Sequence, residues 1–386
     1  MTDLEHVLPL WSELEAAGAD YVLATVVAVE GSSYRKPGAR MLLAQDGRRA
    51  GTVSGGCLEA EVARRAWWLT ADGPVVERYS TLEDDGDLPY GSGCGGVVYI
   101  LLERRKTARA LIAALKAAFD ARTPLAIATI LEGPRIGQRA FAGLPEVAAA
   151  TSQVANEPRL SDEAPLKGLA ELAVERRAPV ERKIAVEGVQ TRVWADYRAA
   201  RPGLWIFGAG DDAKPLLHLA RELGWFVTVA DGRSHLATKD RFAAADNVIA
   251  LPIAELPDAA PAYFDMRASD AAVMMTHSFE QDSRILASLL GVSHGCWPAY
   301  IGVLGPQRRT REVLAEVARM LHLPGTMDST ERWLSQIHAP MGIDLGADTP
   351  ASIALSILAE IQQALTAATA LPLRQVRASR VPVTEG

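Results

Sequence analysis

The second half of the chain alternates short apolar runs with helical stretches of about 10 to 15 residues. This alternation is typical of β-strands joined by crossover helices, which lie parallel in one sheet. The expected strands are 204–207, 226–230, 247–251, 271–275 and 300–304. Five such strands predict half of a doubly wound parallel sheet or slightly more.

A glycine-rich turn follows the first of these strands and opens a helix. Gly208-Ala209-Gly210-Asp211-Asp212-Ala213 fits the G-x-G-x-x-A pattern in the strand-to-helix context that the pattern requires. Gly208 allows the tight turn, and Gly210 lets a phosphate approach the helix N-terminus. Asp231, at the end of the second strand, is placed to accept hydrogen bonds from a ribose. Similar turns occur in sheets that bind no nucleotide, so both interpretations stay open here.

Carboxylates and a histidine stand near this turn. The charges of Asp211 and Asp212 would repel a bare phosphate, which favours a metal-bearing or differently oriented ligand over ordinary NAD. His277 follows the fourth strand, at the edge where open α/β sheets hold ligands. Capping of the next helix accounts for His277 equally simply, and the same two alternatives apply to Asp282.

The first half of the chain has a different order of elements. We expect helices at 3–17, 58–70 and 106–121, strands at 21–29, 39–44, 97–102 and 124–131, and a hairpin about Glu187-Gly188. A Pro-Gly turn at 199–203 marks the domain boundary. The predicted domains are therefore 1–200 and 201–386, and the second ends in a helix over 350–369 with Thr349 as its N-cap.

Two cysteines of the first half stand next to glycines. Cys57 follows Gly55-Gly56 at the predicted start of a helix, where the helix dipole and free amides favour a thiolate. Cys94 precedes a strand and lacks that dipole. A reactive or ligating thiol and a small packed residue both stay open for Cys57. Neither the cysteines nor the seven histidines show a spacing typical of a zinc site.

Three cations stand on a glycine-bearing loop near Cys57. Arg35, Lys36 and Arg40 flank Pro37-Gly38, and the turn Ser54-Gly55-Gly56 follows shortly after. Guanidinium, ammonium and backbone N–H groups together suit an anion. A solvated turn is the alternative interpretation.

Composition excludes several classes of function. The chain has 386 residues, with 40 Lys and Arg against 47 Asp and Glu, and this acidic balance argues against a nucleic-acid-binding protein. An acidic N-terminus and the lack of an apolar run of ~20 residues predict a cytoplasmic protein without a membrane span. Three cysteines in so long a chain indicate free thiols in a reducing compartment.

Several motifs together resemble the xanthine dehydrogenase accessory protein family (XdhC/CoxI). In the first half these are Ala24-Thr25-Val26-Val27, Gly31-Ser32-Ser33-Tyr34-Arg35-Lys36-Pro37-Gly38-Ala39-Arg40-Met41, Ser54-Gly55-Gly56-Cys57-Leu58-Glu59 and Gly93-Cys94-Gly95-Gly96. In the second half they are Phe207-Gly208-Ala209-Gly210-Asp211, Met275-Thr276-His277, Tyr300-Ile301-Gly302 and Pro340-Met341-Gly342-Ile343-Asp344-Leu345-Gly346-Ala347-Asp348-Thr349-Pro350. The resemblance implies an N-terminal mixed α/β XdhC/CoxI domain followed by a Rossmann-like doubly wound domain.

The resemblance implies a maturation chaperone rather than an enzyme with turnover. Family members are understood to hold molybdenum cofactor, as molybdopterin or its dinucleotide, while its terminal oxo ligand is exchanged for sulfur. They then pass it to a molybdenum hydroxylase such as xanthine or carbon monoxide dehydrogenase. The implied partners are the hydroxylase apoenzyme, a cysteine desulfurase as sulfur donor and a second copy of the chain.

The resemblance also assigns roles to residues. Cys57 would contact the cofactor's metal or the sulfur donor, because a thiolate is a soft ligand, and Cys94 is the second candidate. The residues implied to bind the cofactor or a nucleotide are Arg35, Lys36, Arg40, Ser54, Gly55, Gly56, Gly208, Gly210, Asp231 and His277. The chain departs from the family pattern after His277, where an acid is more usual, and at Gly305-Pro306-Gln307.

Two other classes of function stay open. One is an NAD(P)-dependent oxidoreductase that uses the glycine turn at Gly208, and the other is a scaffold with a vestigial Rossmann domain. No acid and base with linked spacing stand near that turn, and Asp211-Asp212 opposes a pyrophosphate. The cofactor chaperone is therefore the leading hypothesis.

Overall fold

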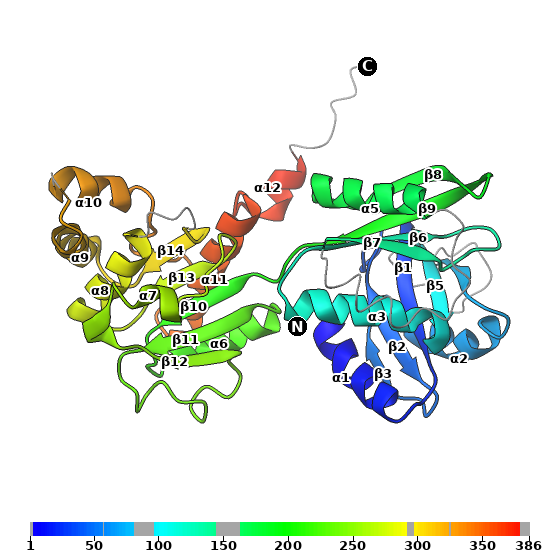
Figure 1. Ribbon diagram of the computed structural model, residues 1–386, viewed down its shortest axis with the longest axis horizontal. Coiled ribbons are helices and arrows are strands. Elements are labelled where there is room, and N and C mark those ends of the chain that lie inside the picture. The colour runs from blue at the N-terminus through cyan, green and yellow to red at the C-terminus, as the bar shows by residue number, and fades with distance from the viewer. Residues whose placement is uncertain are drawn as a thin grey trace, which may run out of the picture. The chain divides into compact units, whose positions relative to one another are not determined.

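The chain folds as two compact units, Met1–Arg201 and Pro202–Gly386, here called the first and second units. The computed structural model describes residues 3–56, 58–80, 96–143, 163–291, 297–323 and 326–378. Within these residues both units combine helices with sheets, and the second unit holds a parallel sheet (Figure 1). The predicted α/β class with a Rossmann-like second part is confirmed.

The first unit contains a five-stranded antiparallel sheet with β1 (Tyr21–Gly31) at its centre. Its order is β3 (Arg49–Gly51), β2 (Arg40–Ala44), β1, β5 (Gly96–Arg104) and β4 (Val75–Ser80). Helices α1 (Asp3–Ala16) and α3 (Arg105–Asp120) pack on one face, and α2 (Glu59–Leu69) packs on the other. Because helices cover both faces, β1 is buried on both sides over most of its length, as its unbroken apolar run predicts.

A second, four-stranded antiparallel sheet completes the first unit. Its order is β7 (Arg139–Ala142), β6 (Leu125–Ile130), β9 (Val189–Arg198) and β8 (Val180–Val186), and α5 (Ala164–Arg176) packs against it. The predicted hairpin is present, and both of its turn residues, Glu187 and Gly188, have positive φ. That backbone conformation matches the twist of a two-residue hairpin.

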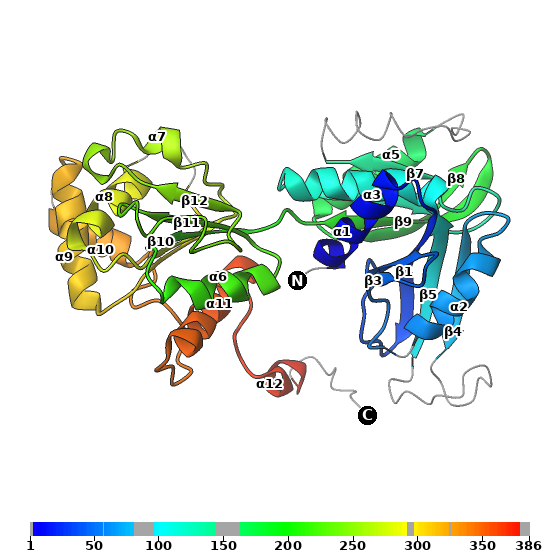
Figure 2. The same ribbon diagram turned by 90° about the horizontal axis from the view of Figure 1, so that it is seen from below.

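The second unit is built on five parallel strands, and each corresponds to a predicted one. The order is β12 (Asn247–Ala250), β11 (Phe226–Asp231), β10 (Gly203–Phe207), β13 (Ala271–Met274) and β14 (Tyr300–Val303). Helices α6 (Ala213–Glu222) and α11 (Pro350–Thr366) cover one face. Helices α8 (Phe279–Leu290), α9 (Gln307–Met320) and α10 (Thr326–Leu334) cover the other (Figures 1 and 2). The chain therefore winds outward from β10 in both directions.

The helix α11 begins where the sequence predicts and ends earlier. Thr349 caps it and forms a reciprocal capping box with Ser352. The helix ends at Thr366, three residues before the predicted 369, because Ala367 adopts a left-handed backbone conformation with φ 51°. One face of α11 is buried, since Ile357 and Ile361 lie in the core of the second unit.

Replacing Ile357, 1% exposed in this core, should destabilise the protein. We expect Ile357→Ala to lower the free energy of unfolding by about 2–4 kcal/mol, because it removes buried apolar surface and leaves a cavity. Leu355 on the same helix is 54% exposed, so Leu355→Ala should change it by less than about 0.5 kcal/mol. Urea denaturation followed by circular dichroism measures both. Equal losses would show that α11 is packed in a different register.

Candidate functional site

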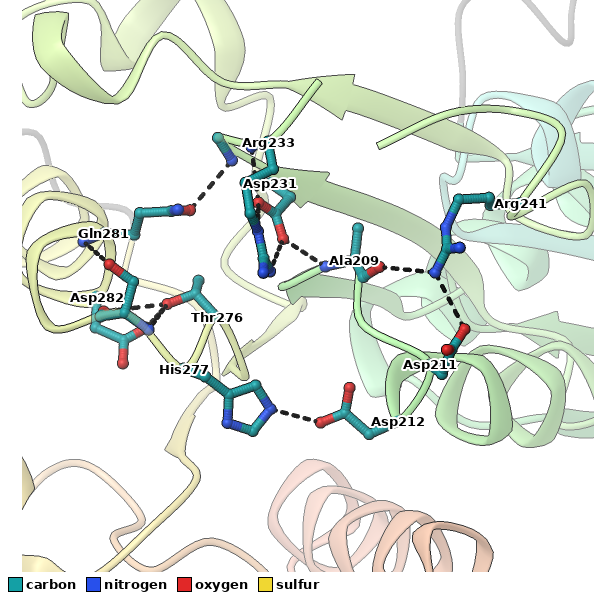
Figure 3. A network of polar contacts seen from close by, with 12 residues as sticks. Ala209, Asp211, Asp212, Asp231, Arg233, Arg241, Thr276, His277, Gln281 and Asp282 are labelled. Atoms are coloured by element: carbon teal, nitrogen blue, oxygen red, sulfur yellow. Dashed lines mark hydrogen bonds and ion pairs between the residues drawn. The ribbon is translucent and has the colours of Figure 1, made fainter. Parts of the chain in front are cut away.

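The loops after β10, β11 and β13 meet at the carboxyl edge of the parallel sheet in the second unit (Figure 3). Because β11 and β13 flank β10, this edge is the point at which the winding direction reverses, where open α/β sheets hold ligands. Gly208 has φ 131°, and a Cβ there would collide with the carbonyl of Met275. Gly208 is therefore required for the close approach of the loops after β10 and β13.

Asp231 joins the end of β11 to the glycine turn. Its side chain is fully buried, and its Oδ2 accepts hydrogen bonds from the Ala209 amide at 2.7 Å and from Arg233 Nη2 at 2.7 Å. Oδ1 accepts from the Arg233 amide and Nε at 2.8 and 3.0 Å. Burial alone would raise the pKa of Asp231, but the hydrogen bonds from Arg233 and Ala209 outweigh it, so the pKa lies below its ordinary value. Both oxygens expected to meet a ribose are thus occupied by protein donors.

The two carboxylates at the helix start have different surroundings. Asp211 is 79% exposed and pairs with Lys214 Nζ at 2.7 Å and with Arg241 Nη2 at 3.0 Å. Lys214 and Arg241 hold the pKa of Asp211 below its ordinary value. Asp212 instead pairs with His277, whose Nε2 lies 2.9 Å from Asp212 Oδ2. Both residues were expected to repel a phosphate. At Asp211 this repulsion is offset by Lys214 and Arg241.

The contact between His277 and Asp212 was missed from the sequence. These residues stand 65 positions apart, so no local spacing links them. Two loops bring them together, and the sheet edge consequently has a carboxylate–imidazole contact that the sequence did not reveal (Figure 3). Ser278 caps α8 by accepting a hydrogen bond from the Gln281 amide. His277 is therefore not the helix cap, which removes one of its two interpretations.

Asp282 is buried and connects neighbouring elements of the second unit. It is 1% exposed, accepts a hydrogen bond from Thr276 Oγ1 at 2.6 Å and pairs with Arg309 Nη2 at 2.7 Å. Next to it in sequence, Gln281 Oε1 accepts from the Gly232 amide at 3.2 Å. These contacts tie α8 to α9 and to the loop after β11. Arg309 was not found by sequence reasoning, because α9 begins far along the chain from Asp282.

In the first unit, the cation-bearing loop lies against the glycine turn. A Cβ on Gly55 would stand 3.5 Å from Cγ of Tyr34, so the Tyr34 side chain packs over Gly55. Tyr34 is 76% exposed and Lys36 is also exposed, while Arg35 is partly buried. The structure therefore brings together the two segments that the sequence predicts to form an anion site.

A hydrogen-bonded pair connects the glycine turn at Ser54 to the start of α2. Ser54 Oγ donates to Glu59 Oε2 at 2.5 Å and accepts from the amides of Gly56 and Leu58 at 3.1 Å each. Burial alone would raise the pKa of Glu59, but hydrogen bonds, chiefly from the Ser54 hydroxyl and amide, hold it below its ordinary value. The amides on either side of Cys57 are thus already bonded to Ser54. Cys57, Cys94 and Cys296 themselves lie outside the described residues.

Arg40 does not face solvent as the anion-site prediction requires. Its side chain is 3% exposed and its Nη2 lies 2.8 Å from Asp196 Oδ2 on β9. Burial, together with the nearby Arg198 and Arg139, lowers the pKa of Arg40 to about 10, although Asp196 opposes this shift. Arg40 Nη1 donates to the Gly38 carbonyl at 3.0 Å, and Arg198 Nη2 donates to the same oxygen. Arg40 therefore supports the cation-bearing loop from inside the unit.

Two features are absent from the part of the chain that the structure describes. No group of three or more His, Cys, Asp or Glu side chains there is arranged to hold a metal ion. None of the described helices combines the length and the apolar character needed to cross a membrane. The predicted metal contact of Cys57 lies outside these residues.

Comparison with known families identifies the chain. Residues 204–361 match the XdhC Rossmann domain, and residues 14–80 match the XdhC and CoxI family. The chain belongs to the XdhC and CoxI family. The resemblance drawn from the sequence motifs is therefore confirmed.

Relatives cover this XdhC and CoxI chain to different extents. A probable xanthine dehydrogenase subunit of Bacillus subtilis (strain 168) is 31% identical over 350 residues, which is 89% of this chain and 92% of that protein. The molybdenum cofactor insertion chaperone PaoD of Escherichia coli (strain K12) is 32% identical over 122 residues, 29% of this chain and 35% of PaoD. A crystal structure of a xanthine dehydrogenase from Bacillus halodurans has a TM-score of 0.66 and 25% identity, covering 97% of this chain and all of that one.

Asp231 should make the stability of this XdhC and CoxI protein depend on pH. The pKa of Asp231 is lower in the folded chain than in the unfolded chain. Its contribution to the free energy of unfolding is therefore complete at a pH above the unfolded-state pKa, and it is lost as the pH falls through the folded-state pKa. At neutral pH, Asp231→Asn should therefore lower the free energy of unfolding by about 2–4 kcal/mol. The difference in the free energy of unfolding between this variant and the wild type should be smaller at about pH 3.

Urea denaturation at both pH values measures this effect. Asp240→Asn is the control, because Asp240 is exposed in the same unit and should leave stability within about 0.5 kcal/mol of the wild type. A loss for Asp231→Asn that is as large in acid as at neutral pH would contradict the assignment.

Proposed function

We propose that this protein is a molybdenum cofactor accessory protein, which binds the cofactor for insertion into a molybdenum hydroxylase of the xanthine dehydrogenase type. The observation that carries the proposal is membership in the XdhC and CoxI family together with similarity to PaoD, a molybdenum cofactor insertion chaperone. The Bacillus subtilis relative supports the choice of hydroxylase, because its name is that of a probable xanthine dehydrogenase component.

The first unit supplies the proposed cofactor site. Arg35 and Lys36 stand on the loop that Tyr34 packs against Gly55, so their cationic groups suit the cofactor's phosphate. Arg40 contributes indirectly, since it is buried and holds the Gly38 carbonyl of the same loop. The Ser54–Glu59 contact fixes the glycine turn that precedes Cys57 in the sequence. In this proposal the Cys57 thiolate contacts the metal or the sulfur donor, and Cys94 is the second candidate.

The finer steps of the proposal concern sulfur and partners. A cysteine desulfurase would serve as the sulfur donor for the bound cofactor, before transfer to the apoenzyme in the cytoplasm. In the second unit, Gly208 and Asp231 contribute by holding the loop at the sheet edge, through a close backbone approach and through hydrogen bonds.

The proposal predicts that the protein carries a pterin. The chain should be purified from a host that makes molybdenum cofactor, then denatured and oxidised, and the fluorescent oxidised pterin quantified. The wild type should release close to one pterin per chain. Arg35→Ala with Lys36→Ala should lower retention by about tenfold or more, because charge-assisted hydrogen bonds to the phosphate are lost.

Arg64→Ala serves as the matched control. Arg64 is 72% exposed on α2 and pairs with Glu61, so its removal takes away a surface cation of the same unit without touching the loop. Pterin retention should stay at the wild-type level. Stoichiometric NAD(P) without pterin in the wild type would instead support an oxidoreductase and refute the proposal.

The role of Cys57 is tested separately. In cells that co-express the partner hydroxylase, Cys57→Ser should lower hydroxylase activity by about tenfold or more, because a hydroxyl is a poor ligand for a soft metal centre. Cys296→Ser is the control, because Cys296 stands in the second half of the chain, outside the motifs assigned to the cofactor, and it should support normal activity. Full hydroxylase activity with Cys57→Ser would remove the thiol from the proposal.

A further inference from the structure

A carboxylate lies where the glycine turn of the second unit would receive a phosphate. In folds of this kind the ligand's phosphate approaches the backbone at the second glycine, near the N-terminus of the following helix. The second glycine here is Gly210, and a Cβ placed on it would collide with Oδ1 of Asp212. Asp212 is the residue directly before α6, so its own side chain folds back over the turn.

His277 holds that carboxylate from the opposite loop. The distance from His277 Nε2 to Asp212 Oδ2 is 2.9 Å, and Figure 3 shows the imidazole reaching across from the loop after β13. The backbone of His277 has φ 59°, which few residues other than glycine adopt. Such a conformation costs free energy and therefore points to a constraint at this position. The contact connects the loops on the two sides of the point where the winding direction reverses.

The neighbouring Asp211 provides an internal contrast. It carries the same charge one residue earlier, but its Oδ1 lies 3.0 Å from Arg241 Nη2 and 2.7 Å from Lys214 Nζ. Its carboxylate is thus bonded to two cations, and its side chain is 79% exposed against 28% for that of Asp212. Loss of either aspartate removes one negative charge from the helix start. Loss of Asp212 also removes the carboxylate oxygen that a Cβ on Gly210 would meet.

We propose that Asp212 is the specificity-determining residue of this sheet edge. Its carboxylate, held by His277, occupies the place over Gly210 that the diphosphate of a dinucleotide would take, so the intact site excludes NAD-type ligands. A carboxylate is purely an acceptor when ionised, so a ligand accommodated with Asp212 in place presents a hydrogen-bond donor there instead of a phosphate. This inference concerns the second unit alone and does not depend on cofactor binding in the first.

Binding of ADP to the full chain tests the inference, because ADP carries the ribose and diphosphate of a dinucleotide. Isothermal titration calorimetry should show that Asp212→Ala binds ADP about tenfold or more tightly than the wild type, as steric and charge exclusion are both removed. Asp211→Ala should stay within about twofold of the wild type, because the carboxylate over Gly210 remains. His277→Asn should give a smaller gain than Asp212→Ala, since asparagine tolerates the left-handed backbone and frees Asp212 to move.

Several outcomes would overturn the inference. Equal gains for Asp211→Ala and Asp212→Ala would attribute exclusion to net charge alone. Tight ADP binding by the wild type, or no gain by a folded Asp212→Ala chain, would show that Asp212 does not exclude the diphosphate. Should Asp212→Ala fail to fold, Asp212→Asn against Asp211→Asn makes the same comparison with side-chain volume retained, and equal affinities in that pair would refute the proposal.

Discussion

The arrangement of the loops at the sheet edge of the second unit depends on the hydrogen bonds that the buried Asp231 carboxylate accepts. The Asp231 carboxylate accepts a hydrogen bond from the Ala209 amide and so fixes the turn after β10 to the end of β11. The guanidinium of Arg233 compensates the negative charge of this carboxylate. The position of this turn then sets the directions of the next two aspartates, one toward Arg241 and Lys214 and the other toward His277. A residue typical of ribose recognition therefore acts here as a support for the loop.

Buried charges support loops in the first unit in the same way. Arg40 and Asp196 join the two sheets of that unit, and Arg40 also donates a hydrogen bond to the Gly38 carbonyl at the base of the cation-bearing loop. Glu59 accepts hydrogen bonds from the Val53 and Ser54 amides and from the Ser54 hydroxyl, and so fixes the start of the glycine turn at Ser54. An unpaired buried charge is costly, so arrangements of these loops that separate such partners are disfavoured. Both units thus hold their glycine turns with carboxylates.

Prediction from the sequence succeeded where the local pattern was strong. All five parallel strands and the capped start of α11 followed from apolar runs and cap residues, whose effects are local. The strand β7 and the helix α5 were not predicted, because the segment around them is rich in Ala and Pro and shows little periodicity. Arg40 was predicted to bind a phosphate but is buried against Asp196. The sequence around Arg40 could not reveal this contact, because Asp196 stands on a distant strand.

By itself the sequence determined the α/β class, the family and the glycine turn at Gly208, because strand periodicity, motif order and turn chemistry are properties of neighbouring residues. Only the tertiary structure decided which charged groups meet. Arg40 and Asp196 are 156 positions apart, and Asp212 and His277 are 65 apart. The physical reason is that such contacts depend on which loops the sheet order places side by side, and strand order is set by packing of the whole unit.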